Sequence, residues 1–238
     1  MPNDLYYLLT ALPALPATPG LPVQAEKAIE MIGEHSSTIS NALFALLSSE
    51  REIFNCGFRF FANEEKDYKP QLPSALPESF VETFMTYSNS KEAEWLTAVF
   101  KAWVDLALEQ ASKAGSSFLR QWALWEYSLR LTLLGERSKN ALKTQNDSAA
   151  LLPYSLKSLS ELPDVSSVVN DWRAISEPLK AEMFLDQARI AFLRANPASF
   201  TFTSDELVAY ILELRIHERY ARFNPDAGRK ILEEVTSL

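Results

Sequence analysis

Apolar residues recur every three or four positions over most of the chain, the spacing that places them on one face of an α-helix. Between Val23 and about Phe61 this spacing predicts two short helices, which Gly33 and the pair Ser36-Ser37 should separate. The apolar positions of these two helices are Ala28, Ile29, Ile32, Ile39, Leu43, Leu46 and Leu47.

The middle of the chain carries two longer apolar stripes. The first consists of Leu96, Val99, Phe100, Trp103, Leu106 and Ala107, and the second of Phe118, Trp122, Trp125, Leu129 and Leu133. Only the short break Ala114-Gly115-Ser116-Ser117 separates them. We therefore predict two amphipathic helices that fold back antiparallel, each covering the apolar face of the other.

Helical spacing returns in the last third, with one stripe at Phe184, Leu185, Ala188 and Phe192 and another at Leu207, Tyr210, Ile211 and Leu214. Pro197 should end the first of these helices. Thr203 and Glu206 form a capping box for the second, and Pro225 opens a short last helix. The β-like runs Leu5 to Leu9 and Phe200 to Thr203 are too short for a sheet. The sequence thus predicts an all-α protein, a bundle of antiparallel amphipathic helices.

Prolines divide the chain more clearly than charge does. Pro13, Pro16, Pro19 and Pro22 recur every third residue, which favours an extended polyproline II arm near the N-terminus. Such an arm is either a ligand for an aromatic groove or a segment packed on the protein's own helices. We favour the second interpretation, because the intervening residues are mostly apolar and none is basic.

The polar segment Asn63 to Pro77 contains three further prolines and is expected to be a surface connector. We place the domain boundary there. Residues 1–77 would hold the arm and the short helices, and residues 78–238 the hairpin and the C-terminal helices. The segment Gln145 to Ser167 has little periodicity and is expected to form a loop with short helical turns.

Composition narrows the function classes. The chain has 238 residues, of which 47% are apolar, so a sizeable core can form without disulfides or metals. Its net charge of −8 argues against a general affinity for nucleic acid or anionic lipid. No apolar stretch reaches the roughly 20 residues that a membrane-spanning helix requires. The single cysteine, Cys56, excludes an intramolecular disulfide and suits a reducing compartment.

Catalytic signals are missing from the sequence. The chain has no glycine-rich phosphate loop, no His-Glu-x-x-His motif and no Gly-x-Ser-x-Gly motif. His35 and His217 are expected to be ordinary, partly exposed histidines at helix ends or on the surface, and Cys56 an inert core thiol among phenylalanines. We therefore predict that the protein is not an enzyme and holds no metal or cofactor.

Two polar clusters lie on otherwise apolar helices. Glu126 and Arg130 are four residues apart beside Trp122 and Trp125, so we expect these four residues to be structural, with a partly buried ion pair. The second cluster consists of Arg215, His217, Glu218, Arg219 and Arg222. Its arginines either form a surface that binds an acidic partner or stabilise the C-terminus of their own helix through its dipole. We name Arg215, Arg219 and Arg222 as candidate partner-binding residues.

Three blocks of the sequence resemble a bacterial family whose members are encoded beside V-type ATPase subunits. The first block is Leu5-Tyr6-Tyr7-Leu8-Leu9-Thr10-Ala11-Leu12-Pro13 and the second is Trp125-Glu126-Tyr127-Ser128-Leu129-Arg130. The third runs from Leu185-Asp186-Gln187-Ala188-Arg189 through Tyr210-Ile211-Leu212-Glu213-Leu214 to Glu218-Arg219-Tyr220. The members of this family look like shortened relatives of the central-stalk C-type component of V/A-type ATPases, whose vacuolar counterpart is the d-type component.

The resemblance implies a non-catalytic subunit in the central stalk of a V/A-type rotary ATPase, with a fold related to the lobes of the C-type stalk component. Its partners would be the rotor shaft and the membrane ring, and it would lie in the cytoplasm against the inner face of the membrane. Nucleotide and ion sites would then reside on other subunits. A helical adaptor unrelated to the ATPase would have the same composition and is the alternative.

Overall fold

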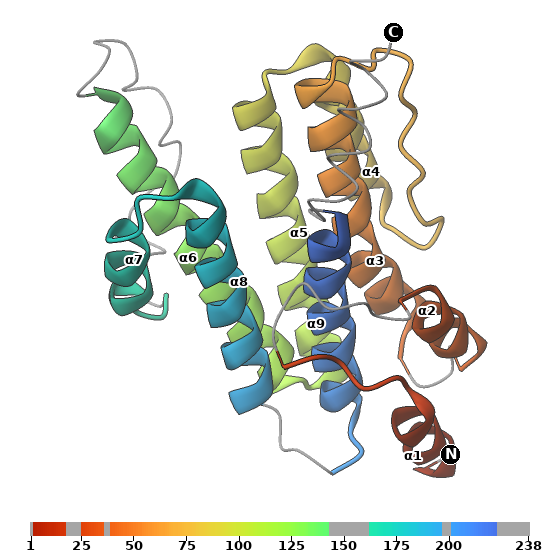
Figure 1. The fold of residues 1–238 in the computed structure, drawn as a ribbon. Coiled ribbons are helices and arrows are strands. Elements are labelled where there is room, and N and C mark those ends of the chain that lie inside the picture. Colours follow the sequence, from red (N-terminus) through yellow and green to blue (C-terminus); the bar gives the residue numbers. More distant parts are fainter. Residues whose placement is uncertain (1, 18–24, 36–38, 143–161, 197–200, 223–238) are drawn as a thin grey trace, which may run out of the picture. The chain divides into compact units, whose positions relative to one another are not determined.

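The computed structural model describes residues 2–17, 25–35, 39–142, 162–196 and 201–222 (Figure 1). Side chains are described over the same ranges except at three helix ends, residues 2–4, 137–142 and 220–222. Within these residues the chain forms nine α-helices and no β-strand. The prediction of an all-α protein is therefore confirmed for the described part of the chain.

The helices belong to two compact units. The first unit joins residues 1–40 to residues 182–238, and the second consists of residues 41–181. The boundary that the sequence predicts after residue 77 falls inside the second unit. We describe each unit by itself.

The second unit contains five α-helices, one π-helical turn and one 3₁₀ turn, together with residues 178–181, the first residues of α8 (Pro178–Ala195). Its elements are α3 (Asn41–Cys56), η2 (Gly57–Ala62), α4 (Glu78–Met85), η3 (Thr86–Asn89), α5 (Glu92–Ala114), α6 (Ser117–Leu142) and α7 (Ser166–Arg173). The sequence pattern does not indicate α4 or α7, since each is only 8 residues long and offers few turns of periodicity.

Helices α5 and α6 form the predicted hairpin. Gly115 ends α5 with a positive φ of 65°, a left-handed conformation that glycine adopts without steric cost. The hydroxyl of the next residue, Ser116, accepts a hydrogen bond of 2.9 Å from the backbone N–H of Leu119 and so caps α6. Farther along the hairpin, the Arg130 guanidinium lies 3.7 Å from the ring centroid of Phe100, which fits an antiparallel pair.

Tryptophans tie α5 to its other neighbours. Trp103 is completely buried, and its indole N–H donates to the carbonyl of Leu46 in α3 over 3.2 Å. The indole N–H of Trp95 donates to the carbonyl of Phe84 in α4 over 2.8 Å. Each buried indole therefore contributes a large apolar surface and fixes its polar atom on a neighbouring helix.

The connector after Asn63 is fixed to α3 by one carboxylate. Glu52 accepts hydrogen bonds from the Tyr68 hydroxyl at 2.7 Å and from the backbone N–H of Gln71 at 3.1 Å. The Tyr87 hydroxyl in turn donates to the carbonyl of Tyr68 at 3.0 Å. Tyr68 is buried as a result, so a segment that is polar in sequence is bound to the core of its own unit.

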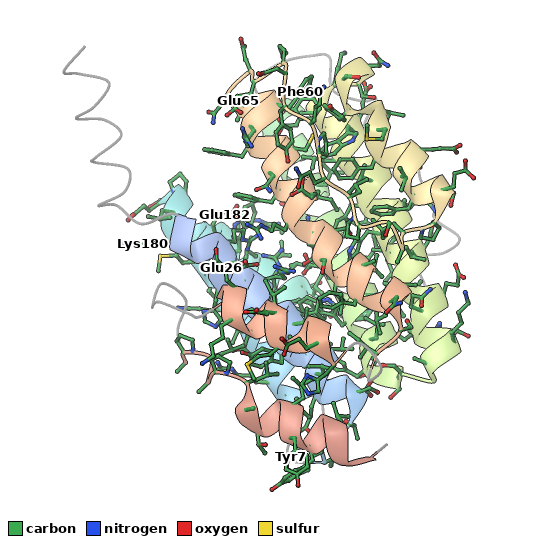
Figure 2. All side chains as sticks on the ribbon, turned by 90° about the vertical axis from the view of Figure 1, so that its right-hand side faces the viewer. Tyr7, Glu26, Phe60, Glu65, Lys180 and Glu182 are labelled. Carbon is green, nitrogen blue, oxygen red and sulfur yellow. The ribbon has the colours of Figure 1, made fainter. Side chains whose placement is uncertain are left out.

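The first unit contains α1 (Pro2–Ala11), α2 (Ala25–Glu34), most of α8 (Pro178–Ala195) and α9 (Ser204–Arg222). The run from Leu5 to Leu9, β-like in sequence, is helical in α1. A proline suits the first turn of a helix, and Leu8 and Leu12, four residues apart, are both buried. Tyr7 lies on the opposite side, 65% exposed, and points away from the helix (Figure 2).

Several predictions of the sequence fall outside the described residues. These are the prolines of the arm beyond residue 17, most of the predicted loop between Gln145 and Ser167, the helix stop at Pro197 and the short helix after Pro225. In the part of the chain that the structure covers, no helix is both long and apolar enough to cross a bilayer.

The α5–α6 hairpin gives a stability test. Trp125 is 8% exposed and stacks on Trp122 with ring centroids 5.6 Å apart, so Trp125→Ala should lower the free energy of unfolding by about 3–5 kcal/mol. Phe58→Ala is the matched control, since Phe58 is 53% exposed and should cost less than about 1 kcal/mol. Urea denaturation of the two variants measures the difference, and equal losses would contradict the packing described.

Candidate functional site: an ionic network on helices α8 and α9

The first unit concentrates buried charge on two helices. α8 begins with Pro178 at its first position and buries Leu185, Ile190 and Leu193, whereas α9 is buried over nearly its whole middle, from Leu207 to His217. Ionised side chains in such a setting must be paired, because an unpaired buried charge is costly. Asp186, Arg189, Glu213, Arg215 and His217 are all buried here.

Two ion pairs connect the helices. Arg219 of α9 binds Asp186 of α8, and Arg194 of α8 binds Glu213 of α9. The α8 partners are eight positions apart, about 12 Å along a helix. Their α9 partners follow in the reverse order, so the two helices run antiparallel and are joined at two levels.

Asp186 is shared by two cations. Its Oδ1 accepts from the Arg189 guanidinium over 2.9 Å, one turn along the same helix, as well as from Arg219. The side chains of Asp186 and Arg189 are only 2% and 8% exposed. The carboxylate therefore neutralises one buried guanidinium of its own helix and holds the partner helix at the same point.

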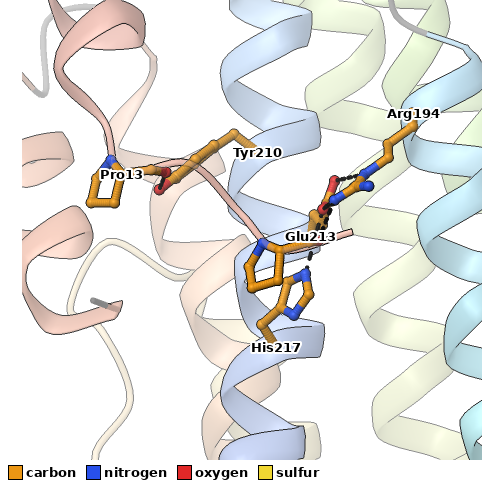
Figure 3. A network of polar contacts seen from close by, with 6 residues as sticks. Pro13, Arg194, Tyr210, Glu213 and His217 are labelled. Carbon is orange, nitrogen blue, oxygen red and sulfur yellow. Dashed lines mark hydrogen bonds and ion pairs between the residues drawn. The ribbon is translucent and has the colours of Figure 1, made fainter. Parts of the chain in front are cut away.

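Glu213 is the second shared carboxylate (Figure 3). Its two oxygens lie 3.0 and 3.1 Å from Nε of Arg194, and Oε1 lies 3.4 Å from Nε2 of His217. Burial by itself would raise the pKa of Glu213. The hydrogen bonds from His217 and Arg194 outweigh burial and hold that pKa below its ordinary value.

The same network holds the N-terminal arm. The Tyr210 hydroxyl donates to the carbonyl of Pro13 over 2.8 Å (Figure 3). Nη2 of Arg194 donates to the carbonyl of Pro16 over 2.6 Å. Burial, and to a smaller extent the charge of Glu213, raises the pKa of Tyr210 to about 12, so this hydroxyl remains a donor at neutral pH. The described part of the arm, residues 12–17, is non-helical and packs on the protein's own helices, the interpretation that the sequence favours.

The candidate partner-binding arginines are placed as follows. Arg215 is buried and paired with Glu218, whereas Arg219 is 27% exposed and paired with Asp186. Arg222 is the last residue of α9, and its side chain lies outside the described residues. Two of the three guanidiniums are thus engaged within their own unit, and their role toward a partner stays a prediction.

The four residues expected to be structural lie in the second unit. Trp122 and Trp125 are buried, and Glu126, only 2% exposed, accepts a hydrogen bond of 2.6 Å from Nε of Arg130. The Arg130 side chain is 42% exposed, and its guanidinium covers the ring of Phe100. The predicted ion pair is therefore present, and the stacking on α5 adds a contact that the sequence does not indicate.

The two histidines differ in burial. His35 lies at the end of α2, where its Nδ1 is 2.9 Å from the carbonyl of Met31. The expectation of a partly exposed residue is wrong for His217, which is fully buried because it faces Glu213 one turn earlier on a buried helix. Among the described residues, no three His, Cys, Asp or Glu side chains gather as a metal site requires.

Cys56 is buried in the second unit. Burial, with a smaller effect from Glu52, raises the pKa of its thiol to about 12. The thiolate that acts as a nucleophile is therefore scarce at neutral pH.

Sequence reasoning missed the residues that organise the network. Asp186, Arg189, Arg194 and Glu213 had no assigned role as ion pairs, since each could have lain on a solvated face. A signal was present for Glu213, which stands between Leu212 and Leu214 in an apolar stretch. A charge inside such a stretch indicates a buried pair, although spacing alone does not name the partner on another helix.

Comparison of the sequence with known families finds one described as "Protein of unknown function (DUF2764)", whose pattern matches residues 63–237. The chain belongs to this family. The match covers α4 to α9, including both helices of the network. No match was found among curated proteins or among solved structures. The family assignment leaves the function open, and the link to the C-type stalk component stays a prediction.

The shared carboxylate gives a second test. Asp186→Asn should cost about 3–5 kcal/mol, because it removes the charge of a buried carboxylate that pairs with both Arg189 and Arg219. Arg219→Gln should cost less, since Asp186 keeps Arg189. The double variant should show a coupling free energy of about 1–3 kcal/mol in a thermal or urea unfolding cycle. Strict additivity would mean that Asp186 and Arg219 do not interact.

The lowered pKa of Glu213 gives a pH test. A carboxyl whose pKa is lower in the folded state stabilises the fold above its unfolded value, about 4.3, and loses that contribution as pH falls through the folded value. The wild type should therefore lose stability below about pH 4 more steeply than Glu213→Gln. The measurement is the free energy of unfolding from neutral pH down through this range, with the exposed Glu30→Gln as control. Parallel curves for the wild type and Glu213→Gln would refute the assignment.

Proposed function

We propose that this protein is a non-catalytic subunit of a bacterial V/A-type rotary ATPase, in a position like that of the C-type component of the central stalk. It would connect the rotor shaft to the membrane ring on the cytoplasmic face of the membrane. Its contribution would be mechanical, with nucleotide and ion sites on other subunits. The family to which the chain belongs is described as one of unknown function, so the family match does not conflict with this role.

One observation carries the proposal. Several of the residues on which the resemblance to the ATPase-associated proteins rests also build the ionic network. Asp186 and Arg189 lie in one part of the third block, Tyr210 and Glu213 in the next, and Arg219 in the last. The third block of the resemblance therefore contains residues that fix α8 to α9.

The arrangement suits a part that transmits force. Apolar contacts are not directional, so ion pairs add a directional restraint to the packing of a helix hairpin. The forked guanidiniums of Arg194 and Arg219 bind carboxylates at two levels and oppose displacement along the helix axes. Torque applied to one helix would reach the other through both pairs.

The experiment is co-purification of the full chain with the rotor-shaft and membrane-ring subunits of the ATPase from the same bacterium. Arg222→Glu should weaken this assembly without unfolding the free protein, and more strongly at low salt, where charges are less screened. Arg120→Glu on α6, an exposed residue, is the matched control with the same change in net charge. Circular dichroism of the free variants verifies their fold.

Arg219→Glu is expected to behave differently. The new carboxylate would face the buried Asp186, so the free protein should itself be destabilised. If the wild-type chain fails to co-purify with either ATPase component, the proposal is wrong and the unrelated adaptor becomes the better interpretation. If Arg222→Glu assembles as well as Arg120→Glu, the contact surface lies elsewhere on the chain.

A further inference from the structure

The docked arm has the burial pattern of a polyproline II helix. Leu12 is buried and Leu15 half-buried, Pro13 and Pro16 are half-buried, and the two alanines at positions 14 and 17 are exposed. A polyproline II helix has three residues per turn, so positions three apart share a face. The described arm therefore presents two faces to the protein and one to solvent.

The contacts with α8 and α9 follow the same period. Tyr210 and Arg194 donate to the carbonyls of Pro13 and Pro16, which are three residues apart and about 9 Å along such a helix. A polyproline II backbone makes no internal hydrogen bonds, so these carbonyls can accept from another element. Glu213 holds the Arg194 guanidinium in place beside the arm. The two donors thus form a site that recognises a Pro-x-x-Pro backbone.

The helix before the arm adds apolar anchors. Leu8 is 1% exposed, and the Tyr6 ring meets that of Phe202 edge to face with centroids 4.6 Å apart. Phe202 precedes α9 and has a φ of 52°, a conformation that costs a bulky residue free energy and that the surrounding contacts must offset. Residues 5–17 therefore bind as one segment, with α1 at one end and the prolines at the other.

We propose that Tyr210 and Arg194 form a docking site for the N-terminal segment of a second copy of this chain, so that copies associate by exchanging residues 5–17. This inference goes beyond the proposed function and does not rest on it. The ligand seated on the site is the chain's own segment, and a second copy presents the same carbonyls and anchors. Exchange remakes each contact between chains and needs no new surface.

The N-terminal segment of a second copy must compete with the chain's own residues 5–17 for the site formed by Tyr210 and Arg194. The tether gives the chain's own segment an effective concentration in the millimolar range, so wild-type chains associate only weakly at micromolar concentration. A test must therefore weaken the internal contact without removing the contact between chains.

Two complementary full-length variants weaken the contact within each chain and keep the contact between chains. The acceptor carries Leu12→Ser and Leu15→Ser, which loosen its own arm and leave its site intact. The donor carries Tyr210→Phe and Arg194→Lys, which remove hydrogen bonds from its own site, keep a cation near Glu213 and leave its arm intact. The donor's arm should then occupy the acceptor's site.

Analytical ultracentrifugation of the equimolar mixture should show a donor–acceptor complex. Two lost hydrogen bonds correspond to at least about tenfold, so the mixture should associate at least that much more tightly than either variant alone. The matched control is an acceptor that also carries Tyr210→Phe and Arg194→Lys, which should not bind the donor. A second acceptor, with Pro13→Gly and Pro16→Gly, loosens the arm through backbone entropy and serves if the serine variant fails to fold.

Two results would overturn the proposal. The first is a mixture that stays monomeric with both acceptors, which would mean that the site does not accept an arm from another chain. The second is equal binding of the donor to the control acceptor, which would place the contact away from Tyr210 and Arg194.

Discussion

The first unit depends on how buried carboxylates are neutralised. Asp186 and Glu213 each face more than one basic side chain, and each joins α8 to α9. A buried ion pair stabilises a fold less than an apolar contact of the same size, but a broken one is strongly destabilising. Such pairs therefore specify which helices meet and in what register, and the hairpin, the docked arm and the buried His217 all follow from that register.

In the second unit, contacts other than buried ion pairs fix how the helices pack on one another. Its helices are joined by indole N–H groups that donate to carbonyls of neighbouring helices, as Trp95 and Trp103 do, and by the stacking of Arg130 on Phe100. Here the polar atoms that fix the geometry sit on large apolar side chains. The core provides the stability and the orientation together.

Helical spacing predicted the α5–α6 hairpin, α8 and α9 because each has several turns of regular apolar positions. The same reasoning took Leu5 to Leu9 as β-like, since bulky tyrosines and leucines in a short run favour either structure, and it missed the short α4 and α7. Within the site, the neighbours one turn apart, Glu126 with Arg130 and Glu213 with His217, can be found by counting residues. Pairs between helices, such as Arg194 with Glu213, depend on packing that the sequence does not encode locally.

The first unit is assembled from both ends of the chain, and this has a consequence for biosynthesis. Residues 1–40 leave the ribosome before the helices they pack with, which lie beyond residue 181. The second unit is continuous and can fold while synthesis proceeds. Leu8 and Leu12 of the N-terminal segment therefore stay exposed while the 141 intervening residues are synthesised. We expect chaperones to bind this apolar surface until the C-terminal helices emerge.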